Sequence, residues 1–193
     1  APAEPAGHRG LARAAQRAPR VTELRRFDER DADALRSFFA RVPEGDRTFF
    51  REDVLADGWR PDPAEHRWLV VDDDAVVGSL AIRPGVAWSS HVGELRIVVD
   101  QTRRRQGIGR ALARTALVEG VGLGLTKLIV EVPAAQESTV AMFAGLGFEP
   151  EALLKDHVRD AAGGLHDLIV MSHFVDGTWA ALETTGIADL ATE

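Results

Sequence analysis

The stretch LRIVVDQTRRRQGIGRALARTAL, residues 95–117, reads as a strand, a basic glycine loop and the start of a helix. The apolar run before Asp100 has the character of a short strand, and the Ala/Leu pattern after Gly109 has helical spacing. At such a junction the first amides of the helix have no partners within it, and the helix end is positive. The stretch therefore predicts an anion-binding site.

The loop residues indicate which anion would bind. Gly107 and Gly109 have no side chains, so backbone amides can approach an anion closely. The charge-assisted donors around them are Arg103, Arg104, Arg105 and Arg110. A bound pyrophosphate would relieve their mutual repulsion, whereas the alternative is a solvated arginine cluster before an ordinary helix. The loop is neither a Walker motif nor a dinucleotide fingerprint, because the Lys-Ser/Thr pair and the third spaced glycine are missing.

Outward from this stretch, hydrophobic periodicity predicts alternating strands and helices. The expected strands are residues 21–29, 68–71, 76–82, 93–100, 126–133, 148–160 and 165–175. The expected helices are residues 31–42, with Asp31 as the cap, then 44–59, 111–118, 137–147 and 176–193.

This order of elements predicts an α/β fold. Hairpins impose antiparallel pairs, whereas strand–helix–strand crossovers impose parallel ones. We expect a mixed, mostly antiparallel sheet of about seven strands, flanked by helices. Residues 21–175 would form this domain, between a basic N-terminal tail at residues 1–20 and a C-terminal helix and tail at residues 176–193.

Composition narrows the function classes. The chain has 193 residues, no cysteine and a formal net charge of −7. The lack of cysteine excludes disulfides, zinc–thiolate sites and thiol nucleophiles, and it fits a reducing cytoplasm. No apolar run approaches the roughly 20 residues that span a bilayer. The acidic balance disfavours nucleic acid as a partner and favours a cationic substrate.

Two features of the basic residues stand apart from this balance. Only Lys127 and Lys155 are lysines among the 23 basic residues, which is typical of a GC-rich bacterial genome. Residues 1–20 contain four arginines and one acidic residue. This tail could tether the domain to nucleic acid or to a protein partner, and it also resembles an organellar targeting peptide.

The stretches LRIVVDQTRRRQGIGRALARTAL and LIVEVPAAQESTVAMFAGLGFEP (residues 128–150) resemble the GCN5-related N-acetyltransferases (GNAT). The core spacing is closest to the bacterial ribosomal-protein N-terminal acetyltransferases, and the resemblance is strongest over residues 94–149. In that family a Gln/Arg-x-x-Gly-x-Gly/Ala loop binds the pyrophosphate of acetyl-CoA, and here it reads Arg104 to Gly109. The resemblance implies the GNAT fold, with the sheet splayed between strands four and five. It also implies acetyl-CoA as cosubstrate, no metal, and direct attack by an amine.

The resemblance assigns cofactor contacts to the loop and to two flanking elements. Backbone groups of the fourth strand would bind the pantetheine arm, and one near Val98 or Val99 would stabilise the developing oxyanion. Gln136 stands where relatives commonly have an asparagine that contacts the cofactor. The full set of implied contacts is Ile97, Val98, Val99, Arg104, Arg105, Gln106, Gly107, Ile108, Gly109, Arg110, Gln136 and Phe143.

An ammonium cannot attack a thioester, so an amine of pKa about 10 must first lose a proton. Two carboxylates are candidate catalytic bases. Glu131 lies on the fifth strand, at the position of the base in the ribosomal-protein acetyltransferases. Glu94 lies near the position of the base in histone acetyltransferases, one residue off in spacing. Either could instead be a surface glutamate, and strand alternation also allows an ion pair between Glu94 and Arg96.

One departure from the family pattern concerns the general acid. Many relatives use a tyrosine to protonate the departing thiolate, and the corresponding position here is Phe143. The chain contains no tyrosine. Either Ser138 or water replaces it, or the protein is a non-catalytic acyl-CoA-binding or regulatory module.

The acceptor amine stays open between a small molecule and a protein lysine or N-terminus. In the family, the first two helices border the acceptor site, where acidic residues could attract a cation: Glu44, Asp46, Glu52 and Asp53. His157 is a further candidate base or substrate ligand. We expect a cytoplasmic protein without a membrane partner, and a homodimer stays open.

Overall fold

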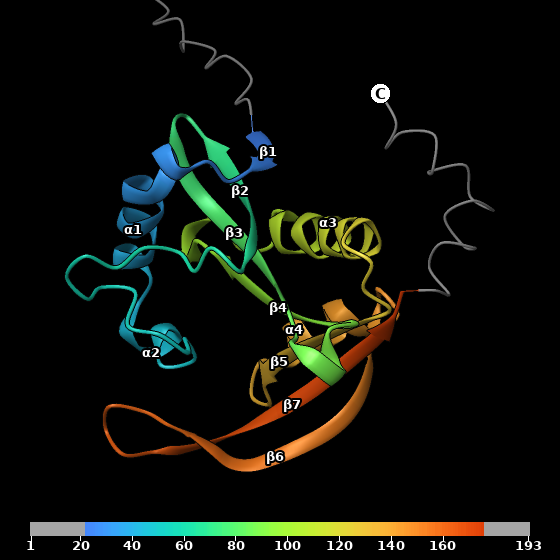
Figure 1. Cartoon of the computed structure of the whole chain (residues 1–193). Coiled ribbons are helices and arrows are strands. Elements are labelled where there is room, and N and C mark those ends of the chain that lie inside the picture. The colour runs from blue at the N-terminus through green and yellow to red at the C-terminus, as the bar shows by residue number, and fades with distance from the viewer. Residues whose placement is uncertain (1–21, 176–193) are drawn as a thin grey trace, which may run out of the picture.

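Seven strands form one sheet in the order β1-β2-β3-β4-β5-β7-β6 in the computed structural model, which describes residues 22–175 (Figure 1). The strands are β1 (Thr22–Arg26), β2 (His66–Asp72), β3 (Ala75–Pro84), β4 (Val92–Val99), β5 (Lys127–Pro133), β6 (Glu149–Arg159) and β7 (Leu165–Phe174). All neighbouring pairs are antiparallel except β4 and β5, which are parallel. The predicted mixed, mostly antiparallel sheet is confirmed. The basic tail at residues 1–20 and the expected helix at 176–193 lie outside the described residues, so the domain boundaries stay predictions.

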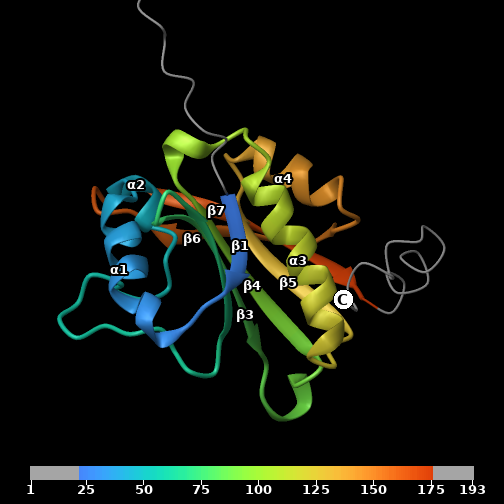
Figure 2. The same ribbon diagram turned by 90° about the horizontal axis from the view of Figure 1, so that it is seen from above.

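Helices cover both faces of the sheet (Figure 2). The α-helices are α1 (Ala32–Arg41), α2 (Glu44–Arg47), α3 (Ile108–Gly122) and α4 (Glu137–Ala144), and short 3-10 turns are η1 (Glu29–Asp31), η2 (Ala87–Ser89) and η3 (Gln101–Arg103). One core lies between the sheet and α3 with α4, and a second lies between the sheet and α1. Within residues 22–175, no helix is both long and apolar enough to cross a membrane.

The position of α3 depends on a glycine in β3. A Cβ at Gly78 would lie 2.9 Å from Cγ2 of Ile108 and 3.2 Å from Cδ1 of Leu112. Real Cβ atoms essentially never come that close, so a larger residue at this position would push the first turns of α3 away from the sheet. The absence of a side chain at Gly78 therefore sets where the N-terminus of α3 lies.

The splay between β4 and β5 comes from their short parallel pairing. Val92 pairs with Lys127, and the ladder ends where Leu95 pairs with Val130. Beyond that point β4 continues to pair with β3, up to Val99 opposite Gly78, while β5 pairs with β7. The last part of β4 therefore has one edge that no strand covers among the described residues, as the family resemblance implied.

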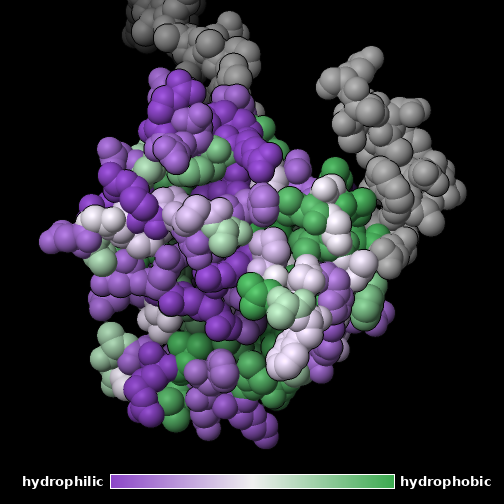
Figure 3. All heavy atoms as spheres, viewed as in Figure 1, coloured by the Kyte–Doolittle hydropathy of each residue, from purple (hydrophilic) through white to green (hydrophobic). Residues whose placement is uncertain are grey.

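Strand alternation places polar side chains on the α1 face at this splay. Leu95 and Val130 belong to the core under α3 and α4. Their neighbours Glu94 and Glu131 therefore point to the opposite face, towards α1 and α2. Figure 3 shows hydrophilic side chains gathered around α1, β1 and β2, and hydrophobic ones around α3 and along the lower part of the sheet, where they are mixed with hydrophilic residues.

One local prediction was wrong and another was confirmed in part, since Asp31 is the N-cap residue of α1. The helix expected at 44–59 ends after one turn, at Arg47. Phe50, Val54 and Trp59 still reach the α1 core, but from an irregular chain; Asp53 accepts a hydrogen bond from the amide of Leu55 (3.0 Å), a turn that competes with helix. Asp31 makes no side-chain cap bond to α1.

The Asp31 carboxylate has other partners. It accepts hydrogen bonds from Arg25 (2.7 and 2.8 Å) and from the amide of Asp28 (2.9 Å), which closes a capping box over η1. The Arg25 hydrogen bond lowers the pKa of the Asp31 carboxyl.

Candidate acyl-transfer site

The glycine loop, residues 103–110, ends in a left-handed turn at the start of α3. Gly107 is the N-cap residue and has φ +84°, a conformation that costs other residues strain. The first ladder bond runs from the amide of Ala111 to the carbonyl of Gly107 (2.9 Å). The amides of Ile108, Gly109 and Arg110 precede that ladder and point out of the helix end, which favours an anion there.

The arginines of the glycine loop have different partners. Arg103 forms an ion pair with Asp72 of β2, whose side chain is 2% exposed. Arg104 forms an ion pair of 2.6 Å with Asp46 of α2. Arg110 donates to the carbonyl of Gly145 (3.1 Å), at the end of α4. Arg105 is exposed and forms no ion pair with the described residues. Two carboxylates thus offset part of the repulsion between the loop arginines that a bound pyrophosphate was expected to relieve.

The open edge of β4 and the glycine loop border the same gap in the sheet. Ile97 and Val99 pack towards α3 and α4, whereas Val98 packs towards α1. A Cβ placed on Gly109 would lie 3.7 Å from Cγ2 of Val99 and 3.5 Å from Sδ of Met142. These are ordinary contacts, so packing alone does not require glycine at position 109. A bare backbone there leaves the helix end open to a ligand that runs along β4.

Both candidate bases contact the same guanidinium group. Arg51, from the irregular segment after α2, forms an ion pair with Glu131 and another with Glu94 (3.4 Å). Glu94 also accepts a hydrogen bond from Arg96 Nε (3.1 Å), so the ion pair that alternation allowed is present. The side chains of Glu94 and Glu131 are 25% and 22% exposed. Carboxylates from two strands therefore meet where β4 and β5 separate.

Arg96 connects these carboxylates to a buried ion pair. It donates to Glu65 (3.0 Å), which pairs with Arg67 (2.5 Å). The side chains of Glu65 and Arg67 are 1% and 6% exposed, and burial lowers the pKa of the Arg67 guanidinium. We call the whole set the carboxylate network: Arg51, Glu52, Glu65, Arg67, Glu94, Arg96 and Glu131. The buried Glu65–Arg67 pair holds Arg96 in place through Glu65, and the other members of the network are partly exposed to solvent.

The sequence model of the acetyltransferase (GNAT) family matches residues 23–148. The chain belongs to the GNAT family. It is 34% identical over 76 residues to the [ribosomal protein bS18]-alanine N-acetyltransferase of Escherichia coli K12, which covers 39% of this chain and 51% of that protein. It is 50% identical over 52 residues to a mycothiol acetyltransferase of Mycolicibacterium smegmatis, which covers 27% of this chain and 17% of that protein. The matches thus span about half the length of the first curated relative and less of the second.

Solved structures show the same GNAT fold at low sequence identity. An acetyltransferase of the GNAT family from Streptococcus pneumoniae has a TM-score of 0.68 at 18% identity, covering 79% of this chain and 98% of that one. A ribosomal-protein-alanine N-acetyltransferase from Brucella melitensis has a TM-score of 0.63 at 22% identity, covering 79% and 99%. A protein from Salmonella typhimurium whose structure contains acetyl-CoA has a TM-score of 0.64 at 14% identity, covering 80% and 94%. These likenesses confirm the predicted fold.

Two positions implied by the GNAT resemblance lie on α4. Gln136 is the N-cap residue of α4, and its side-chain oxygen accepts from the hydroxyl of Thr139 (3.2 Å). Phe143 is 2% exposed and packs edge-to-face on Phe148 at 5.1 Å between ring centroids. Ser138 is exposed in the first turn of the same helix. Phe143 is thus a core residue of this GNAT domain, and the cofactor contacts of Gln136 and Phe143 stay predictions.

His157 and His166 are not members of the carboxylate network. His157 is exposed on β6. His166 of β7 pairs with Asp160 (2.8 Å) and meets the ring of Phe49 at 5.8 Å, so the β6–β7 hairpin contacts the segment after α2. The hydrogen bond from His166 lowers the pKa of the Asp160 carboxyl. Residues 22–175 contain no group of acidic, histidine or cysteine side chains placed to hold a metal ion.

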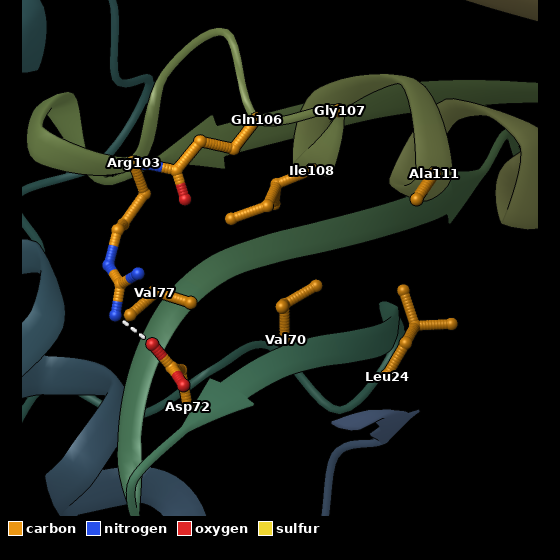
Figure 4. A pocket seen from close by; sticks show the side chains of 9 residues that line it. All are labelled: Leu24, Val70, Asp72, Val77, Arg103, Gln106, Gly107, Ile108 and Ala111. Carbon is orange, nitrogen blue, oxygen red and sulfur yellow. Dashed lines mark hydrogen bonds and ion pairs between the residues drawn. The ribbon is translucent and has the colours of Figure 1, made fainter. Parts of the chain in front are cut away.

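A cavity of about 360 Å³ lies behind the glycine loop, between β1–β3 and α3 (Figure 4). Its walls are mostly apolar, with the Arg103–Asp72 pair at one end. The lining residues are Leu24, Val70, Asp72, Val77, Arg103, Gln106, Gly107, Ile108 and Ala111. The Arg103–Asp72 ion pair thus lines one end of this cavity and links the loop to β2.

The sequence reasoning did not find Arg51, Glu65 or Arg67. Each lies in a stretch without a motif. Arg51 and Glu65 have partners far along the chain, such as Arg96 for Glu65, whereas Glu65 and Arg67 pair two residues apart. Only the charges of the segment before β2 hinted at a polar site. By contrast, both glutamates that the resemblance singled out are in the network.

Proposed function

We propose that the protein is an acetyl-CoA-dependent N-acetyltransferase that acts on a cationic primary amine by direct attack. The observation that carries the proposal is the meeting, at one break in the sheet, of a helix N-terminus suited to pyrophosphate and two carboxylates suited to an ammonium. The family match makes acyl transfer the reaction class to test.

The residues around the break fit acetyl-CoA. The amides of Ile108, Gly109 and Arg110 precede the helical ladder, and Arg105 has no competing ion pair among the described residues. The edge of β4 from Ile97 to Val99 that faces β5 pairs with no described strand, so its backbone groups can hydrogen-bond an extended pantetheine arm. Bound there, acetyl-CoA supplies an activated acyl thioester.

The proton of the acceptor ammonium goes to one of the two carboxylates, directly or through water. Glu131 lies at the splay and Glu94 beside it, and both alternatives stay open because Arg51 contacts both. Once neutral, the amine nitrogen forms a bond to the acyl carbon, and the carbon–sulfur bond breaks. The thiol has an ordinary pKa of about 8.5, so a thiolate is a tolerable leaving group near neutral pH. Ser138 or water is then sufficient to protonate it, in a chain without tyrosine.

The proposed acceptor is a chemical class, the cationic primary amines. The curated relatives are named for different acceptors, a ribosomal-protein alanine in one case and mycothiol in another. The net charge of −7 and the two carboxylates favour a cation over an anion. The predicted cytoplasmic location, the bacterial source and the homodimer stay predictions.

A second candidate function is a non-catalytic acyl-CoA-binding module. It is favoured by the absence of tyrosine from the chain and by Arg51, which forms ion pairs with both candidate bases. The two functions are separated by titrating acetyl-CoA calorimetrically and then measuring CoA release with alaninamide, spermidine and a lysine peptide. Binding with amine-dependent release supports the enzyme, binding without release supports the module, and no binding overturns both.

A further inference from the structure

Arg51 holds both candidate bases with a single side chain. Its Nε lies 3.4 Å from Glu94 Oε1, and its Nη2 contacts Glu131 Oε2. Nε and one Nη lie on the same edge of a guanidinium, so this edge faces carboxylates from two different strands. A cation thus already occupies the position between β4 and β5 at which the proposed acceptor would bring its ammonium.

The two glutamates depend on Arg51 to different degrees. Glu94 keeps Arg96 as a partner when Arg51 leaves, at 3.1 Å from Nε. Among the described residues, Glu131 forms no ion pair other than that with Arg51. Removing Arg51 therefore exposes one unpaired carboxylate beside a paired one, which is a site for a new cation.

The surroundings of Arg51 allow its side chain to leave while the backbone stays. Arg51 is 47% exposed, so its ion pairs are screened by solvent and open readily. Both of its neighbours are anchored. Phe50 packs edge-to-face on Phe39 at 5.4 Å, and Glu52 accepts a hydrogen bond from the indole of Trp59 (2.9 Å).

We propose that Arg51 is an internal stand-in for the acceptor, and that a cationic acceptor binds by displacing its guanidinium from Glu94 and Glu131. This inference rests on the proposed function for the meaning of the site, but the competition itself needs no acetyl transfer. It makes Arg51 a specificity-determining residue. Only an amine that brings its own positive charge can replace a guanidinium, so neutral and anionic amines are rejected.

The displacement is tested without acetyl-CoA, using methylguanidinium as the probe. Spectra of backbone amides are recorded for wild type, Arg51→Ala and Arg51→Lys during titration with methylguanidinium chloride, against sodium chloride at equal ionic strength. We expect saturable shifts at Glu131 and Ile129 in wild type and in Arg51→Ala, with a dissociation constant about two- to fivefold lower in Arg51→Ala, because no guanidinium has to be displaced there. In Arg51→Ala with Glu131→Gln, the shifts should disappear.

Arg60→Ala is the matched control. Arg60 lies in the same irregular segment and pairs at the surface with Asp33 (3.6 Å), away from both glutamates. This variant should bind the probe no more tightly than wild type. Melting temperatures of all variants establish that the fold is retained, and Arg51→Gln repeats the test with a side chain of similar reach and no charge.

Kinetics supply the second readout. With alaninamide as acceptor, Arg51→Ala should lower KM about two- to fivefold, because exposed ion pairs change an equilibrium by no more than about fivefold. Methylguanidinium should inhibit this variant competitively with alaninamide and not with acetyl-CoA.

Three outcomes overturn the inference: equal probe binding by wild type and Arg51→Ala, probe binding by neither, or a raised KM in Arg51→Ala, which would make Arg51 a direct acceptor ligand. Failure of the proposed function looks different. It is the absence of acetyl-CoA binding and of CoA release in wild type, whatever the probe does.

Discussion

The glycine loop and the carboxylate network border the same break in the sheet, but they are assembled in different ways. The loop is one continuous segment at the end of β4, and Gly107 with the first turn of α3 forms its helix end. The network takes its members from β2, β4, β5 and the segment between α2 and β2. The proposed cofactor site is thus a local motif, whereas the proposed acceptor face of this chain is built from residues remote in sequence.

The difference extends to how charge is balanced. In the loop, Arg105 is left without an ion pair among the described residues, while in the network each charged member has at least one partner of opposite charge or a hydrogen bond. The loop is therefore ready for an added anion. In the network, an incoming cation would compete with Arg51 for Glu94 and Glu131.

The largest effect is expected at the network. Replacing the true base by glutamine, in Glu131→Gln or Glu94→Gln, should lower kcat about 10²–10⁴-fold, because proton removal from the ammonium is lost. Steady-state kinetics with alaninamide, and the pH profile of kcat/KM, measure this. Glu151→Gln is the matched control, since Glu151 pairs with Lys127 (2.7 Å) away from the break. If neither variant lowers turnover or shifts the profile, both assignments are wrong.

The next effect is expected in the loop. Gly107→Val puts a β-branched residue at φ +84°, which should cost about 1–3 kcal/mol in strain. The strain should unwind the start of α3 and weaken acetyl-CoA binding about 5- to 150-fold, measured by calorimetry. Gly122→Ala is the control, because no atom lies within 4 Å of its added Cβ and its φ is not positive. Equal acetyl-CoA affinity in both variants would show that the helix end does not hold the cofactor.

Variants of two loop arginines should separate an effect on folding stability from an effect on acetyl-CoA binding. Arg103→Ala removes one partner of the buried Asp72 carboxylate and should lower the free energy of unfolding by about 1–3 kcal/mol. Arg105→Ala should leave unfolding unchanged, yet weaken acetyl-CoA binding and reduce its salt dependence, because Arg105 is exposed and unpaired among the described residues. Denaturant titration and calorimetry measure the two quantities. An unchanged acetyl-CoA affinity in Arg105→Ala would remove it from the cofactor site.

The smallest effect is expected at the border of the acceptor face. His166 lowers the pKa of Asp160, so the folded protein holds that carboxylate charged to a lower pH than the unfolded chain does. The stabilisation is present above the ordinary aspartate pKa and is lost as the pH falls through the depressed one. In Asp160→Asn this contribution should be missing, so melting temperatures of variant and wild type should converge only at acid pH. A constant difference at all pH values would contradict the assignment.

Much of the fold could be predicted because its signals are local. The run 95–117 contains a strand, a positive-φ glycine and an amphipathic helix, each encoded by neighbouring residues. The break between the strands expected at 68–71 and 76–82 was equally readable, and Asp73 and Asp74 adopt positive φ there. The expected helix at 44–59 was wrong because apolar spacing alone favoured it. Contacts of Phe50 and Trp59 with the α1 core decide that path instead.

The sequence by itself determined the strand–loop–helix unit and the mixed sheet, since alternation and helix-end chemistry act over a few neighbouring residues. The two candidate carboxylates came from the family resemblance. Only the tertiary structure decided that Arg51 bridges Glu94 and Glu131 and that Arg103 is fixed to Asp72. Ion pairs between residues tens of positions apart depend on which strands lie side by side and where their ladder ends. No local sequence pattern predicts these ion pairs, because they form only when the strands assemble into the sheet.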